Sequence, residues 1–248
     1  FINLNGTLYF VARDNTNSWK LWKSDGTETG TVVIKTIPDN GYFSMGKPIV
    51  VNGNIYFRGP FQNELWKSDG TEAGTQVMKT FGNRVSTLWN IYNTLYIVAD
   101  DGTSGYELWK SDGTESGTVL FKDINPGAYS SIPRNLTEFT DDKFVFTAND
   151  GVHKDAIWIS DGTEAGTQMI KNFEVRMGGI GSMKEFISYN GSVFFSVILE
   201  NTGQELWKTD GTEQGTVMVK DIYPGSKSSY PRLFVVHDNL LFFRAYNE

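Results

Sequence analysis

One stretch of this chain recurs five times and limits what the chain can fold into. Its clearest copy, residues 64–75, reads Glu-Leu-Trp-Lys-Ser-Asp-Gly-Thr-Glu-Ala-Gly-Thr. The Trp and the Asp-Gly-Thr-Glu-x-Gly-Thr that follows it are identical in every copy, and successive tryptophans lie 44, 43, 49 and 49 residues apart. A period in the forties is typical of repeat proteins. The repeated positions are Trp22, Asp25 and Gly26; Trp66, Asp69 and Gly70; Trp109, Asp112 and Gly113; Trp158, Asp161 and Gly162; and Trp207, Asp210 and Gly211.

The repeated stretch has the chemistry of a hairpin turn. Strand-like residues precede and follow each copy. Between them an Asp can accept bonds from backbone amides, and two glycines can take the positive φ that reverses the chain. Carboxylates and hydroxyls also bind calcium, but an EF-hand loop needs oxygens at alternating positions through twelve residues. The motif lacks that spacing, so we predict that it is a structural turn.

A second repeated unit precedes each Trp motif. It is a polar two-residue turn followed by an apolar or aromatic strand, and a further short apolar segment lies upstream in most copies. Each repeat therefore reads as four antiparallel strands in forty-odd residues, the size of one propeller blade. A β-helix has shorter rungs, and a sandwich would not repeat so strictly. The copies of this unit are residues 5–10, 52–57, 92–97, 141–146, 190–195 and 238–243.

The predicted fold class is therefore all-β, a β-propeller of four-stranded antiparallel blades. We predict one propeller domain over 1–248, with repeats at about 1–40, 41–82, 83–126, 127–175, 176–224 and a partial 225–248. The aromatic unit occurs six times and the Trp hairpin five times, which predicts at least six blades, one of them incomplete in this chain. Because the chain starts at Phe1 inside a predicted strand, it is expected to be part of a longer protein. A ring completed by another chain is the alternative.

Composition excludes several functions. The formal charge of −7 argues against nucleic-acid binding, which needs clustered Lys and Arg. There is no cysteine, so disulfides, thiol catalysis and cysteine-ligated metals are excluded. No apolar run is long enough to predict a membrane span.

The repeated Glu-Leu-Trp-Lys-Ser-Asp-Gly-Thr-Glu-x-Gly-Thr resembles the bacterial ELWxxDGT-repeat family, also labelled hyalin-like, over nearly the whole chain. The departures are Lys20-Leu21 in the first copy, and Ala156-Ile157 and Ile159 in the fourth. The resemblance implies a large secreted or cell-surface protein, often from Bacteroidetes and exported by type IX secretion, whose machinery would be a transient partner. It supplies no catalytic residues.

The sequence offers little catalytic chemistry. Its two histidines, His153 and His237, have no second histidine at ligand spacing, and no nucleophile or nucleotide motif occurs. We therefore predict no enzyme, no catalytic residues, no metal site and no cofactor. Two alternatives stay open: a propeller glycosidase or lyase, since two carboxylates across a cleft suffice, and calcium at the loop carboxylates Asp100, Asp101 and Asp150.

Binding is the stronger hypothesis. Exposed aromatic rings beside polar loop residues can stack on sugars, while Asp and Asn bind hydroxyls. Packing between blades is the competing role for each ring. We predict a secreted or cell-surface module for binding, adhesion or scaffolding, with a protein or glycan partner, and a glycan-binding lectin as the alternative. The candidate ligand-binding residues, all outside the invariant Trp position, are Trp19, Tyr42, Trp89, Tyr106, Tyr129 and Tyr230.

Overall fold

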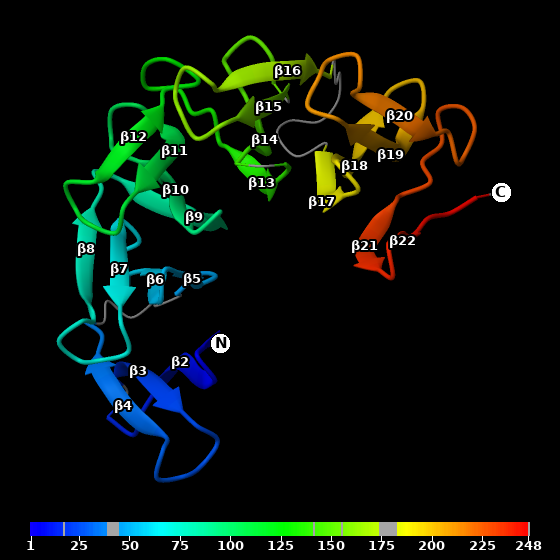
Figure 1. Cartoon of the computed structure of the whole chain (residues 1–248). Helices are drawn as coiled ribbons and strands as arrows, with labels where there is room; N and C mark the ends of the chain where they lie inside the picture. The colour runs from blue at the N-terminus through cyan, green and yellow to red at the C-terminus, as the bar shows by residue number, and fades with distance from the viewer. Residues whose placement is uncertain (17, 39–44, 141, 155, 174–182, 248) are drawn as a thin grey trace. The chain divides into compact units, whose positions relative to one another are not determined.

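The chain forms a series of small antiparallel sheets (Figure 1). The computed structural model describes residues 1–248 except 17, 39–44, 141, 155, 174–182 and 248. The described residues contain no helix, five four-stranded sheets and one two-stranded sheet, and the strands of each sheet stand in chain order. The prediction of repeated four-stranded antiparallel sheets is confirmed. No helix long and apolar enough to cross a membrane occurs in the described part.

The sheets fall into two compact units, Phe1–Asp123 and Ile124–Glu248. The first unit contains β1 (Ile2–Leu4), β2 (Thr7–Arg13), β3 (Trp19–Ser24) and β4 (Val32–Thr36); β5 (Ile49–Val51), β6 (Asn54–Arg58), β7 (Glu64–Ser68) and β8 (Gln76–Thr80); and β9 (Arg84–Ile91), β10 (Thr94–Asp100), β11 (Tyr106–Ser111) and β12 (Thr118–Lys122). The second contains β13 (Arg134–Glu138), β14 (Phe144–Ala148), β15 (Ala156–Ser160) and β16 (Gln168–Asn172); β17 (Met183–Tyr189), β18 (Ser192–Leu199), β19 (Gly203–Thr209) and β20 (Val217–Lys220); and the pair β21 (Arg232–His237) and β22 (Leu240–Arg244).

Two-residue turns join the first two strands of every sheet except the one that begins with β13. In the second sheet, Val51 pairs with Asn54, and both turn residues have positive φ, 46° at Asn52 and 72° at Gly53. Positive φ at both central positions defines the type I′ hairpin, whose twist matches that of the strands it joins. Asn and Gly tolerate this region best, which accounts for the recurrent polar pair ahead of each aromatic strand.

The repeated Asp-Gly-Thr-Glu-x-Gly-Thr forms the same hydrogen-bonded turn in all five copies. In the second copy, Asp69 Oδ1 accepts bonds from the amide and the hydroxyl of Thr71, at 2.8 and 2.7 Å. The Thr71 hydroxyl accepts a bond from the Gly74 amide at 3.0 Å, and Thr75 Oγ1 donates to the Thr71 carbonyl at 2.6 Å. A Cβ on Gly74 would lie 2.1 Å from Asp69 Oδ1, so only glycine fits beneath the carboxylate. The Asp, both Thr residues and the second Gly of the motif therefore form hydrogen bonds within the turn itself.

Within each unit, these turns also contact the preceding sheet. In the first unit, the turn of the second sheet lies against the first sheet: a Cβ on Gly70 would meet the Tyr9 hydroxyl at 2.5 Å. The next turn repeats the arrangement, with Gly113 against the Tyr56 hydroxyl and the Lys67 Nζ donating to the Gly113 carbonyl at 3.2 Å. Burial first, and then the charge of Asp112, raises the pKa of Tyr56.

The invariant Trp occupies one register position in every four-stranded sheet. It lies on the third strand and pairs with a residue of the second strand, namely Phe10, Phe57, Ile97, Phe146 or Phe195. A bulge in the outermost strand follows directly, because the ladder shifts at the Trp in all five sheets. A bulge re-aims the extra side chain. The extra residue is Met78 in β8 and Ile170 in β16, both 8% exposed. The bulge residue of one sheet and the Trp of the following sheet belong to the same apolar contact, as Met78 and Trp109 do.

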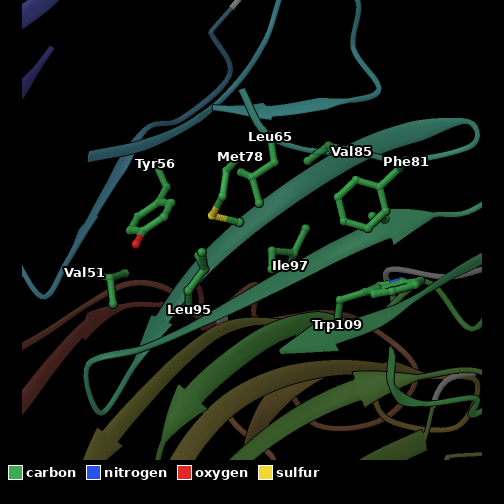
Figure 2. Close-up of a cluster of buried hydrophobic side chains, with 10 residues drawn as sticks. Val51, Tyr56, Leu65, Met78, Phe81, Val85, Leu95, Ile97 and Trp109 are labelled. Atoms are coloured by element: carbon green, nitrogen blue, oxygen red, sulfur yellow. The ribbon is translucent and has the colours of Figure 1, made fainter. Parts of the chain in front are cut away.

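Figure 2 shows this contact between the second and third sheets. Tyr56, Leu65 and Met78 of one sheet face Leu95, Ile97 and Trp109 of the next. The Phe81 ring, just after β8, meets the Trp109 ring edge-on at 5.1 Å. Edge-to-face pairs of this kind add about 0.5–1.5 kcal/mol to the area they bury. Phe173 and Trp207 repeat the pair in the second unit, with ring centroids 5.2 Å apart.

The first residue of the motif has a role that the turn chemistry did not predict. Glu205 is completely buried, and its carboxylate accepts bonds from the Ile222 amide at 2.9 Å and from the Ser229 amide and hydroxyl at 3.0 and 2.6 Å. It therefore ties the connection after β20 to its own sheet. Glu107, equally buried, precedes the one other connection with the matching Asp-Ile-x-Pro-Gly sequence. In the fourth sheet, where Ala156 replaces Glu, the connection has a different sequence.

The hydrogen bonds of the repeated turn predict that the fold loses stability in acid. Hydrogen bonds from the side chain and amide of Thr71 lower the pKa of Asp69, and the same bonds from Thr163 lower that of Asp161. A carboxyl whose pKa is lower in the folded than in the unfolded chain stabilises the fold above its unfolded value, near 4. That stabilisation is lost as pH falls through the folded value.

We expect a ¹³C NMR titration of Asp69 to give a pKa below the ordinary value in the wild type and in T71S, which keeps the hydroxyl. In T71V the pKa should rise. An ordinary pKa for Asp69 in the wild type would contradict this account of the turn.

Candidate functional site

The strongest candidate site is a pocket of about 400 Å³ in the first unit, beside Trp89. It lies between residues 45–47, ahead of β5, and residues 86–90 of β9, with Ile49 and Arg58 completing the wall. We call it the Trp89 pocket. The Asn90 amide holds its two sides together by donating to the Val50 carbonyl at 2.8 Å. Its volume is within the range of ~300–1,000 Å³ that is usual for ligand sites.

Trp89 presents carbon to this pocket. The side chain is half-buried, and its indole nitrogen is inaccessible and has no acceptor among the described residues. The accessible part of the ring is therefore its hydrocarbon face and edge. A flat apolar surface of this kind suits the apolar face of a sugar ring or another planar ligand.

The charge around the pocket is positive, although the chain as a whole carries −7. Lys47 and Arg58 line the pocket, and its lining contains no carboxylate. Burial, followed by the nearby charge of Arg84, lowers the pKa of Arg58, while Tyr106 acts in the opposite direction. Guanidinium groups stay protonated at neutral pH, so the positive charges of Arg58 and Arg84 repel each other. A bound anion would relieve that repulsion.

The six candidate aromatic residues do not lie together in one site. Trp89 lines the pocket, and Tyr106 lies close enough to Arg58 to influence its charge. Trp19 is half-buried and packs against the core of the first sheets, with the Arg13 guanidinium 4.8 Å from its ring centroid. Tyr42 lies outside the described residues.

The other two candidates belong to the second unit. Tyr129 is 76% exposed in the connection after β12. Tyr230 is 51% exposed with φ of 51°, and its ring meets that of Tyr246 edge-on at 6.4 Å. Neither tyrosine lines the Trp89 pocket or either of the two other pockets identified in the described structure. Trp89 is thus the one candidate that lines the pocket in the described part of the chain.

The loop carboxylates considered for calcium hold their own loops. Asp100 accepts bonds from the Gly102 amide and the Asn83 side chain, both at 2.7 Å. Asp101 accepts from the amides of Thr103 and Ser104 at 2.8 Å, and Asp150 accepts from the amide of His153 at 2.7 Å. No group of three or more His, Cys, Asp or Glu that could hold a metal ion occurs in the described part of the chain.

Sequence reasoning missed the basic residues of the Trp89 pocket. Arg58 ends an aromatic strand and Lys47 precedes an apolar one, so each reads as an ordinary strand-end charge. The one available signal was positional: Arg58 ends its aromatic strand where the corresponding residues of the third and fourth repeats are Val98 and Thr147. Only the packing of β5 beside β9 brings them to Trp89.

No protein-family model and no curated protein sequence matches this chain. Solved structures do. The computationally designed Ika8 protein is 15% identical, with a TM-score of 0.52 over 98% of this chain and 68% of its own. Puromycin hydrolase is 12% identical, with a TM-score of 0.53 over 96% of this chain and 40% of its own, so the chain spans less than half of that protein. At these identities the similarity concerns the fold alone, which is of the β-propeller type.

Proposed function

We propose that this chain is a non-enzymatic binding module of a secreted or cell-surface protein, and that the Trp89 pocket binds a glycan carrying negative charge. The observation that carries the proposal is the combination of an accessible Trp ring with Lys47 and Arg58 in a pocket whose lining has no carboxylate. Charge-assisted hydrogen bonds from Arg and Lys to a carboxylate or sulfate are strong and directional. The Trp would supply the stacking surface and the cations the selectivity.

Binding is favoured over glycoside hydrolysis by the same lining. A glycosidase needs two carboxyl groups on opposite sides of the scissile bond, about 5–10 Å apart. The Trp89 pocket offers none among the described residues. Puromycin hydrolase, an enzyme of similar fold, shares 12% identity and gives no residue to carry across.

We further propose that the chain belongs with the ELWxxDGT-repeat proteins and contributes to a propeller of at least six blades, with β21 and β22 as the start of the sixth. The bulge residue of the fifth sheet, Val219, is 44% exposed, whereas its counterpart Ile170 is 8% exposed. Both faces of β22 are also exposed, since the successive residues Phe242 and Phe243 are 50% and 38% exposed. A hairpin carrying the repeated Trp would cover Val219 and pair with β22.

The test uses trigalacturonate and neutral galactotriose as probes in calorimetric titrations. We expect the wild type to bind trigalacturonate and to bind galactotriose at least tenfold more weakly. W89A and R58M should each weaken trigalacturonate binding at least tenfold, with melting temperatures within a few degrees of the wild type.

The matched control is W19A, which removes a Trp that packs on the core. It should lower the melting temperature and leave the affinity of the remaining folded protein unchanged. Unchanged affinity in W89A, or no binding of either sugar by the wild type, would overturn the proposal. Retention of a protein partner without sugar binding would assign the chain to the scaffold class instead.

A further inference from the structure

The second unit contains a larger cleft, of about 940 Å³, between its first two sheets. One wall comes from the loop after β14 and the end of β16, and the other from the loop after β18 and from β19. Its lining combines aromatic, amide and cationic side chains: Phe173 and Trp207, Asn172 and Asn201, and Lys154 and Lys171. We call it the Trp207 cleft.

The floor of the cleft is a preformed aromatic corner. The rings of Phe173 and Trp207 meet at 86°, with centroids 5.2 Å apart. The indole nitrogen of Trp207 is inaccessible, so the half-buried ring presents carbon to the cleft, as Trp89 does in its pocket. Repeat packing fixes this corner, because Phe173 and Trp207 occupy the positions of Phe81 and Trp109.

The corresponding corner of the first unit lies beside a packed connection. There the connection after β8 packs directly on the loop after β10: a Cβ on Gly82 would lie 1.9 Å from the Asp101 carbonyl oxygen. The Asn83 amide donates to the Asp100 carbonyl at 3.0 Å. Lys79, the counterpart of Lys171, lies over the rings of Phe81 and Trp109, at 5.8 and 5.7 Å from their centroids. The repeat frame therefore carries the same aromatic corner twice, and in the second unit this corner lines the cleft.

The cleft is rich in donors for an anion. Lys154 is exposed, Lys171 is half-buried, and neither forms an ion pair with a described residue. Glu200 is the one acidic residue of the lining, and His153 is held by Asp150, with Nδ1 and Oδ2 2.8 Å apart. Amide groups of Asn172 and Asn201 stand beside the two lysines in the same lining, where they can bind hydroxyls.

We infer that the Trp207 cleft is a second binding site, for a segment of an acidic oligosaccharide whose sugar ring packs in the Phe173–Trp207 corner and whose carboxylate or sulfate pairs with Lys154 and Lys171. An acidic peptide would use the lysines but has no saturated ring to fill the corner. The cleft lies within the second unit, so this site does not depend on the Trp89 pocket.

The experiment isolates the second site by working in the W89A variant, where the first site is disabled. We expect W89A to retain weaker but measurable binding of trigalacturonate. Adding K171M should weaken that remaining binding at least tenfold. Adding K79M instead, which removes the equivalent lysine of the first unit, should change it less than twofold.

A second pair of changes tests the aromatic corner. In the W89A background, W207L should abolish the remaining binding and W109L should not, although both remove a Trp at the same repeat position and should lower stability similarly. The inference is overturned if W89A binds no trigalacturonate, if K171M and K79M behave alike, or if hexaglutamate binds W89A as tightly as trigalacturonate does. Failure of the Trp89 proposal would appear separately, as unchanged affinity in W89A.

Discussion

Replacing Glu205 by alanine is expected to destabilise the second unit by about 3 kcal/mol or more, because three donors lose their acceptor at a fully buried position. Ser229, like Glu205, is completely buried, so its amide and hydroxyl are shielded from solvent that could replace the carboxylate. For a chain of this size, that corresponds to a fall in melting temperature of roughly 6–12 °C. E205Q should be intermediate, since it keeps one acceptor oxygen and places an NH₂ group among donors.

Glu64 provides the matched control for Glu205. It stands at the same motif position but is half-buried, and its carboxylate accepts a hydrogen bond from the Trp66 indole at 2.8 Å. We expect E64A to cost about 1 kcal/mol. Thermal unfolding followed by circular dichroism would measure both changes. Equal effects of E205A and E64A would contradict the assignment of Glu205 as the clamp of the following connection.

Replacing Gly82 by alanine is expected to have an effect of similar size for a steric reason. The new Cβ would lie 1.9 Å from the carbonyl oxygen and 2.6 Å from the carbonyl carbon of Asp101, and both atoms belong to the backbone. Relief requires the connection after β8 to move away from the loop after β10. We expect a loss of about 3 kcal/mol in the free energy of unfolding.

The control is G53A, at a glycine with φ of 72° and no atom within 4 Å of an added Cβ. That change has only a conformational cost, about 1 kcal/mol. Urea unfolding of the two variants would separate the effects. A G82A variant no less stable than G53A would show that the connection and the loop are not in direct contact.

The repeat frame was predictable because its chemistry is local. The Asp, Thr and Gly of each turn bond to one another within seven residues, so the sequence of residues 69–75 contains the whole interaction. The I′ turns are local in the same way. Five copies then made the four-stranded repeat visible without any knowledge of packing.

The candidate site was predictable only in part, because its residues meet through contacts between sheets. Trp89 could be singled out as an aromatic outside the motif. Its partners Lys47 and Arg58 are 42 and 31 positions earlier in the chain. The role of Glu205 was hidden for the same reason, since its partners Ile222 and Ser229 lie 17 and 24 residues away. Number of blades and ligand identity stay predictions.

The central claim is that the repeated tryptophans of the first two sheets, Trp22 and Trp66, build the frame while Trp89 meets the ligand. The most direct measurement is an NMR titration of ¹⁵N-labelled indole groups with trigalacturonate, since the seven tryptophans give seven assignable signals. We predict that the Trp89 signal shifts and saturates with the ligand, while the signals of Trp22 and Trp66 stay in place. Shifts at Trp22 or Trp66 with none at Trp89 would contradict the account.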